Sequence, residues 1–170
     1  MNANSLDPQW LRAWATDITA HLQSVLAAFD TYYPFPPGEN EVILTSHDHR
    51  DGLETLRTHP VPPDLITFYG TINEVVMADI GNAYFIHAPT LVLAHLASYS
   101  LLHNAADGII FATDGGGTFF VIGQDGTIHR SLTASTETGF EPIATDLRDF
   151  LEQLRDTVTR FVTTKEPGDL

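Results

Sequence analysis

The stretch GIIFATDGGGTFFVIGQDGTIHR, residues 108–130, decides the fold because β-type apolar runs alternate in it with glycine-containing turns. Three runs rich in β-branched and aromatic residues cover 108–113, 118–122 and 127–130. Glycine takes the positive φ values that tight hairpin turns require. The stretch therefore predicts a three-stranded antiparallel meander in which Gly115, Gly116 and Gly117 form a structural turn, followed by a second turn at Asp125-Gly126.

The three consecutive glycines are also compatible with a ligand loop, either for a phosphate or for a calcium ion. A phosphate cradle normally opens a helix and has a basic side chain nearby, whereas a strand follows here and no lysine precedes Lys165. A calcium loop needs several closely spaced oxygen ligands, and only Asp114 and Asp125 are available. The pattern favours the hairpin.

Amphipathic helices are predicted at both ends of the chain. Asp7-Pro8 is a typical helix start, and apolar residues recur every three or four positions behind it. A similar stripe follows Thr145 near the C-terminus. The other expected elements are strands at 41–46, 73–80 and 82–88, the last two around a tight turn at Gly81-Asn82, short helices at 60–72 and 89–99, and polar loops at 32–41 and 131–141.

These elements predict one α+β domain over residues 1–170, with a twisted, mostly antiparallel sheet flanked by the N-terminal helix (5–29) and the C-terminal helix (145–161). Residues 163–170 are expected to form a flexible tail. At 170 residues and 43% hydrophobic residues the chain is able to build a core without disulfides, and it contains no cysteine.

The charge balance bears on the partners of the protein. The chain has 22 acidic against 8 basic residues, a formal net charge of −14, which disfavours binding to nucleic acid. The longest apolar segment, PTLVLAHLASYSLL, is too short for a membrane span and contains a histidine, and no secretory signal opens the chain. We expect a cytoplasmic protein with no membrane contact, whose acidic surface either serves solubility or meets a basic partner.

Residues 42–52, VILTSHDHRDG, contain the clearest catalytic alternative. His47, His49 and Asp51 resemble the first zinc motif of the metallo-β-lactamase fold, which would make the protein a small metal-dependent hydrolase. Gly52 stands where that motif has its last histidine, and no second motif of this kind follows. We therefore expect a polar loop with no metal or other cofactor. No serine lies in a nucleophile elbow, and the carboxylates of the last helix mark its solvent side.

Three segments carry a resemblance to a known family. VPPDLITFY (61–69), the glycine hairpin at 109–130 and ATDLRDFLEQL (144–154) resemble conserved segments of the SUKH superfamily, the fungal Knr-type cell-wall regulators and their bacterial relatives. The resemblance covers about residues 60 to 155, and residues 1–58 form a weakly matched N-terminal part.

The resemblance implies an α+β fold without catalytic activity and, for the bacterial branch, an immunity protein that binds and neutralises a cognate toxin, often a nuclease. A general interaction domain without a toxin partner is the other non-enzymatic alternative. We expect a basic protein partner, because a surface built to attract phosphates is lined with Lys and Arg. The expected contact residues are Glu74, Asp79, Tyr84, His87 and Asp114.

Overall fold

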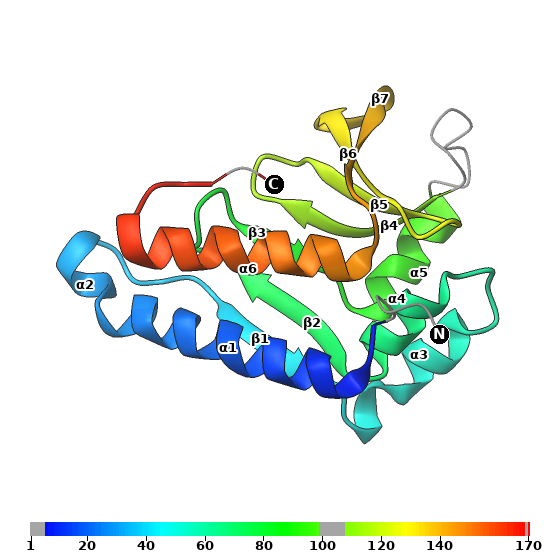
Figure 1. Ribbon diagram of the computed structural model, residues 1–170, viewed down its shortest axis with the longest axis horizontal. Helices are drawn as coiled ribbons and strands as arrows, with labels where there is room; N and C mark the ends of the chain where they lie inside the picture. The colour runs from blue at the N-terminus through cyan, green and yellow to red at the C-terminus, as the bar shows by residue number, and fades with distance from the viewer. Residues whose placement is uncertain (1–5, 99–107, 169) are drawn as a thin grey trace.

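The computed structural model describes residues 6–98, 108–168 and 170, and in this part of the chain seven strands form one antiparallel sheet (Figure 1). The strands lie side by side in the order of the sequence. They are β1 (Asn40–Leu44), β2 (Ile72–Met77), β3 (Tyr84–Ile86), β4 (Gly108–Asp114), β5 (Phe119–Gly123), β6 (Ile128–Thr133) and β7 (Ser135–Ala144). The predicted α+β class and the meander at 108–130 are confirmed.

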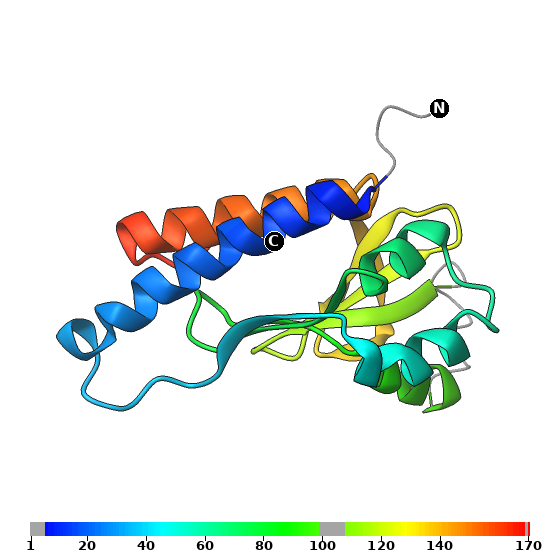
Figure 2. The same ribbon diagram turned by 90° about the horizontal axis from the view of Figure 1, so that it is seen from below.

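The helices are distributed over both faces of this sheet. The described residues contain α1 (Pro8–Ala27), α2 (Phe29–Tyr32), the 3-10 helix η1 (His47–His49), α3 (Arg50–Leu56), α4 (Pro63–Tyr69), α5 (Pro89–Ser98) and α6 (Leu147–Thr164). The long helices α1 and α6 run side by side over one face, as both views show (Figures 1 and 2). Helices α3 and α5 contact each other near one end of the opposite face, where α5 packs on β4 (Figure 2).

Both long helices begin at aspartate caps that the sequence supplies. The Asp7 carboxylate accepts hydrogen bonds from the backbone N–H groups of Gln9 and Trp10, each at 2.9 Å, and Asp146 accepts one from Asp149 at 2.8 Å. Trp14 of α1 is buried, and its indole N–H donates to the Leu151 carbonyl of α6 at 2.8 Å. A directed hydrogen bond thus fixes how the two helices lie against each other.

Strand register divides the sheet into rows that face opposite sides. Cross-strand pairing aligns one row of Val42, Val75, Ile86, Ala112 and Phe120, which packs into the core under α1 and α6. The neighbouring row must face the other way because successive side chains on a strand alternate. That second row consists of Glu41, Val76, Phe85, Thr113 and Phe119.

Two expectations about the elements were wrong. Residues 131–141, expected as a polar loop, belong largely to β6 and β7, because β-branched threonines and the pairing of the two strands outweigh their polarity. Residues 50–52, expected at the end of a polar loop, instead begin α3, whose Leu53 and Leu56 are buried. In the segment 163–170, predicted to be a flexible tail, α6 continues to Thr164, and the Gly168 carbonyl accepts hydrogen bonds from Tyr84 Oη and Asn82 Nδ2 at 3.2 and 3.3 Å.

The predicted glycine turns are present, but glycine is required at these positions for different structural reasons. Gly117 and Gly126 have φ values of 85° and 87°, and Gly81 has 56°, so all three occupy the left-handed region. Gly116, the middle of the triplet, does not. Gly115 is required by close approach, because a Cβ there would lie 2.5 Å from the Asn82 carbonyl oxygen.

Candidate functional site

The face of the sheet opposite α1 and α6, here called the open face, carries partly exposed apolar side chains. Val76 and Phe85 lie on neighbouring positions of β2 and β3, and Phe119 lies on β5 beyond Thr113 of β4; the three apolar side chains are neither buried nor fully exposed. Helices α3 and α5 cover only one end of this side (Figure 2). The result is an apolar strip of sheet beside the exposed carboxylate of Glu41.

Three glutamates form an acidic cluster at the β1–β2 edge of the open face. Glu41 and Glu74 lie on adjacent antiparallel strands, paired with Val76 and Ile43 respectively, and Glu39 immediately precedes β1. Partial burial raises the pKa of Glu74 above its ordinary value, and the charges of Glu39 and Glu41 raise it further, while His49 lowers it. The three carboxylates therefore repel one another in the free protein.

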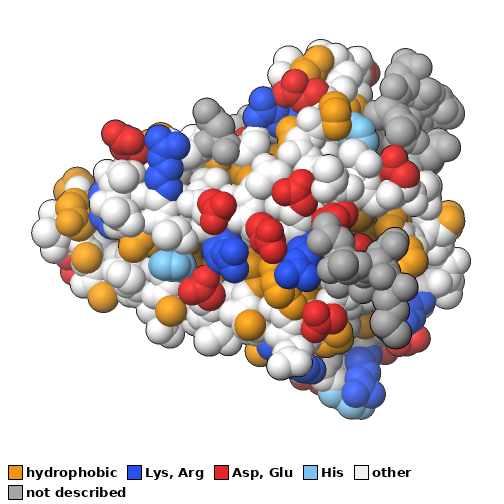
Figure 3. All heavy atoms as spheres, in the orientation of Figure 1, with side chains coloured by type: hydrophobic (Ala, Val, Ile, Leu, Met, Phe, Trp, Pro, Cys, Tyr) orange, Lys and Arg blue, Asp and Glu red, His pale blue; other side chains and the backbone are white. Residues whose placement is uncertain are grey.

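The acidic cluster differs from the carboxylates on the helix face. There, acidic and basic side chains are interspersed (Figure 3), and Arg148 and Arg160 lie 3.2 and 3.7 Å from Glu152 and Glu166. Among the ion pairs of residues 6–98, 108–168 and 170, none involves a glutamate of the acidic cluster. The cluster is thus a local concentration of unneutralised negative charge next to apolar surface.

The structure does not bring the five expected contact residues onto one face. Glu74 belongs to the acidic cluster, and His87 follows β3 on the same side, where its Nε2 lies 3.1 Å from Thr113 Oγ1. Tyr84 points to the core side and is only 3% exposed, so it is no surface anchor.

The two aspartates of the set bind backbone groups at turns. Asp114 caps the glycine turn by accepting hydrogen bonds from the Gly116 and Thr118 N–H groups at 2.9 and 2.8 Å. Asp79 accepts from Gly38 N at 2.7 Å and Asn40 Nδ2 at 2.6 Å.

The open-face members that sequence reasoning missed are Glu39, Glu41, Val76 and Phe85. Glu41 and Val76 become neighbours only through the pairing of β1 with β2, which are separated in the sequence by η1, α3 and α4. The sequence of β2, INEVVM, does not alternate polar and apolar residues, and only burial alternates, between buried and partly exposed positions in the second half of the strand.

His87 is held neutral on the covered end of the open face. Burial lowers its pKa to about 4, with a smaller contribution from His95, whose ring lies edge-on at a centroid distance of 5.4 Å. The pKa of His95 is also lowered by burial. At neutral pH this pair adds no positive charge near the acidic cluster.

A polar pocket of about 250 Å³ lies on the core side of the sheet, near the C-terminal segment. Tyr84, Asp114, Arg130 and Glu141 are among its lining residues. Arg130 Nε lies 2.6 Å from Glu141 Oε1, and its Nη1 donates to the Leu170 carbonyl. The guanidinium is thus already engaged by protein groups, and the polar side chains of this region bind the Gly168 and Leu170 carbonyls.

The His47, His49 and Asp51 motif is placed where η1 meets α3. His49 Nδ1 accepts a hydrogen bond from Ser46 N at 3.1 Å and belongs to a capping box at the start of η1. In the described part of the chain no group of three or more His, Asp or Glu side chains is arranged to hold a metal ion. His49 thus has a structural role that the sequence pattern did not reveal.

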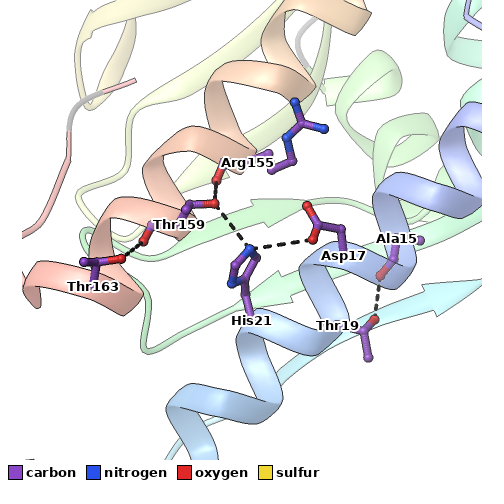
Figure 4. A network of polar contacts seen from close by, with 7 residues as sticks. All are labelled: Ala15, Asp17, Thr19, His21, Arg155, Thr159 and Thr163. Carbon is purple, nitrogen blue, oxygen red and sulfur yellow. Dashed lines mark hydrogen bonds and ion pairs between the residues drawn. The ribbon is translucent and has the colours of Figure 1, made fainter.

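Figure 4 shows a Thr–His–Asp contact between α1 and α6 whose geometry differs from that of a catalytic triad. His21 Nε2 lies 3.3 Å from Thr159 Oγ1 and 3.7 Å from Asp17 Oδ1, so both neighbours meet the same ring nitrogen. A triad requires the hydroxyl and the carboxylate on opposite ring nitrogens. The Thr159 hydroxyl also donates to the Arg155 carbonyl at 2.8 Å. The contact joins the two helices and provides no relay for a nucleophile.

No protein-family model matches the chain, and no curated protein matches its sequence. Among the described residues, no helix is both long enough and apolar enough to cross a membrane. What the chain itself defines is an α+β domain with one antiparallel sheet, two long helices on one face and an acidic, partly apolar region on the other.

Proposed function

We propose that this protein is a non-enzymatic protein-binding module of the immunity type, which uses the open face to cover a basic surface on a cognate toxin such as a nuclease. The observation that carries the proposal is the acidic cluster, three carboxylates without an ion-pair partner in the described chain, beside apolar Val76 and Phe85. The resemblance of residues 60–155 to SUKH proteins adds the immunity role.

The physical argument concerns charge and burial together. A nuclease site is rich in Lys and Arg because it must attract phosphates, and grouped carboxylates complement it. In the free protein the carboxylates of the acidic cluster repel one another, and a cationic partner would remove that repulsion. Val76 and Phe85 would supply the apolar area that an interface core requires.

The test starts from the immobilised chain and a lysate of its source. The retained protein is purified, and its association and dissociation rates are measured at about 0.05 and 0.5 M salt. We expect a basic partner whose association slows severalfold at the higher salt, because screening acts on the approach. If the partner degrades nucleic acid, adding the chain at equimolar amounts should abolish that activity.

A charge-matched pair of variants separates the acidic cluster from net charge. Glu39→Gln, Glu41→Gln and Glu74→Gln together change the formal charge from −14 to −11, as do Asp17→Asn, Glu137→Gln and Asp156→Asn at exposed sites elsewhere. The first variant should slow association at least several times more than the second. Equal effects would remove the open face from the proposal, and an acidic partner or a rate indifferent to salt would overturn the charge argument.

A further inference from the structure

A second surface stands out where the chain leaves α2. In the described residues, the only aromatic side chains that are strongly exposed are Tyr32 and Phe35, at 57% and 54%. Between and after them come Pro34, Pro36 and Pro37, all exposed. We call Tyr32 and Pro34–Pro37 together the aromatic ledge. Soluble domains seldom gather aromatic and proline side chains at one exposed point without a binding role.

The aromatic ledge is held in place by internal contacts. The Phe35 ring lies 5.9 Å from the buried Phe29 ring and 5.6 Å from Tyr33, measured between centroids. The Lys165 ammonium, at the end of α6, lies 5.1 Å from the centre of the Tyr32 ring. Proline residues restrict the backbone further. Such side chains lose little conformational freedom on binding, which is a property of interface hot spots.

The aromatic ledge is continuous with the acidic cluster. Gly38 N donates to Asp79 Oδ2 at 2.7 Å, and the Glu39 carbonyl accepts from Ala78 N at 3.1 Å, so the segment is tied to the β2–β3 turn. Figure 2 shows this segment running level with the sheet and away from the helix layer. Glu39 follows Phe35 by four positions, so their Cα atoms lie at most about 14 Å apart. A typical partner footprint, about 800 Å² and roughly 30 Å across, is wider than this separation.

We infer that the aromatic ledge is the apolar anchor of the interface, and that its occupant is an apolar pocket on the same basic protein that meets the acidic cluster. The inference rests on the proposed function for the identity of the partner. Lys165 lies at the Tyr32 end of the ledge, whereas Glu39 and Glu41 follow its Phe35 end, and these two carboxylates select a pocket with a basic rim on that side. In this division of roles the anchor governs dissociation, whereas the acidic cluster governs encounter.

The experiment compares two exposed apolar residues of the full chain against the partner captured from the source lysate. Phe35→Ser removes the ledge ring, and Leu132→Ser is the control, because Leu132 is 56% exposed on β6. We expect Phe35→Ser to raise the dissociation rate at least tenfold with little change in association. Leu132→Ser should change dissociation less than twofold. Tyr32→Ser, tested separately, should act in the same direction as Phe35→Ser.

The outcomes distinguish this inference from the proposed function. Unchanged dissociation for both Phe35→Ser and Tyr32→Ser, with slower association for the acidic-cluster variant, overturns the anchor and leaves the proposed function standing. If the captured partner is acidic or neutral and the ledge variants dissociate from it faster, the ledge still acts as an anchor. That result overturns the proposal of a basic partner and the inference that the ledge fits a pocket with a basic rim. Retention of no protein by the wild-type chain counts against both. Circular dichroism spectra that match wild type establish that the serine variants are folded.

Discussion

At the scale of single residues, glycine positions divide into those that need positive φ and those that need space. Gly115 donates its N–H to the Asn82 carbonyl at 2.9 Å and to the Ala83 carbonyl at 3.1 Å, which connects the β4–β5 turn to the β2–β3 turn. A side chain at Gly115 would collide with the backbone oxygen that it binds. The triplet therefore matters through contact with another turn as well as through its own turn.

Replacing Gly115 tests this contact. Gly115→Ala should lower the free energy of unfolding by about 2 kcal/mol, because its Cβ forces the two turns apart. Gly116→Ala is the control, since its Cβ would meet only the Asp114 side chain, at 3.3 Å. Urea unfolding of both variants measures the difference. An equal loss in the two variants would show that backbone flexibility, not close approach, selects glycine at 115.

The lowered pKa of His87 predicts a pH dependence of stability. Above pH 6.5 the imidazole is neutral in both the folded and the unfolded chain. Between pH 6.5 and 4 the unfolded chain takes up a proton that the folded chain refuses, so stability falls over this window. After allowance for solvent screening, we expect a loss of about 2 kcal/mol.

His87→Gln isolates this contribution. The variant should lose less stability than wild type between pH 7 and pH 4.5, measured by chemical unfolding at both values. Glu74 titrates in the opposite sense, because its raised pKa favours the folded state at low pH, and it is present in both proteins. Identical pH profiles would mean that His87 is solvated enough to protonate in the fold.

At the scale of elements, one indole supplies a buried hydrogen bond between α1 and α6. Trp14→Phe removes the hydrogen bond to the Leu151 carbonyl and part of the buried ring, and it should cost about 1–2 kcal/mol of stability. Trp10→Phe should cost less, because Trp10 is partly exposed and its contact with the Arg148 guanidinium, at 4.8 Å, survives with a phenyl ring. Thermal unfolding of the two variants provides the comparison, and a larger effect at Trp10 would contradict it.

Element types followed from sequence where one face had a clear apolar pattern. Helices α1 and α6 and the strands of the 108–130 meander carry such patterns, together with caps or turn glycines. Strand β7 has no such pattern, because most of its residues are polar and at least partly exposed. It is a strand because it pairs with β6. Helix α3 has no clear pattern either, because it is only seven residues long, has no side-chain cap, contains Gly52 and buries only Leu53 and Leu56.

At the scale of the whole molecule, the net charge of −14 lowers the stability of the fold through repulsion between like charges. This repulsion is strong in the acidic cluster, where three carboxylates lie close together. Like charges on adjacent strands destabilise a sheet by about 0.2–1 kcal/mol per pair. Glu74→Gln should therefore raise the free energy of unfolding at low salt by about 0.5 kcal/mol, and the gain should shrink as salt screens the repulsion.

The control for that prediction is Glu137→Gln, an exposed position on β7. Its effect on stability should be smaller than that of Glu74→Gln at the same salt. If Glu74→Gln stabilises the free protein and also slows partner association, the cluster is retained for binding at the expense of stability. Destabilisation by Glu74→Gln would show that the carboxylate makes a favourable contact in the fold.

The sequence by itself determined the α+β class, the antiparallel meander at 108–130 and the two capped helices at the ends of the chain, because these depend on local periodicity, turn glycines and capping aspartates. Only the tertiary structure decided which residues share a face. Register placed Tyr84 in the core and Glu74 on the open face, although both had been assigned to one contact surface. Pairing between distant strands fixes such neighbours, since a shift of one residue would reverse every side chain.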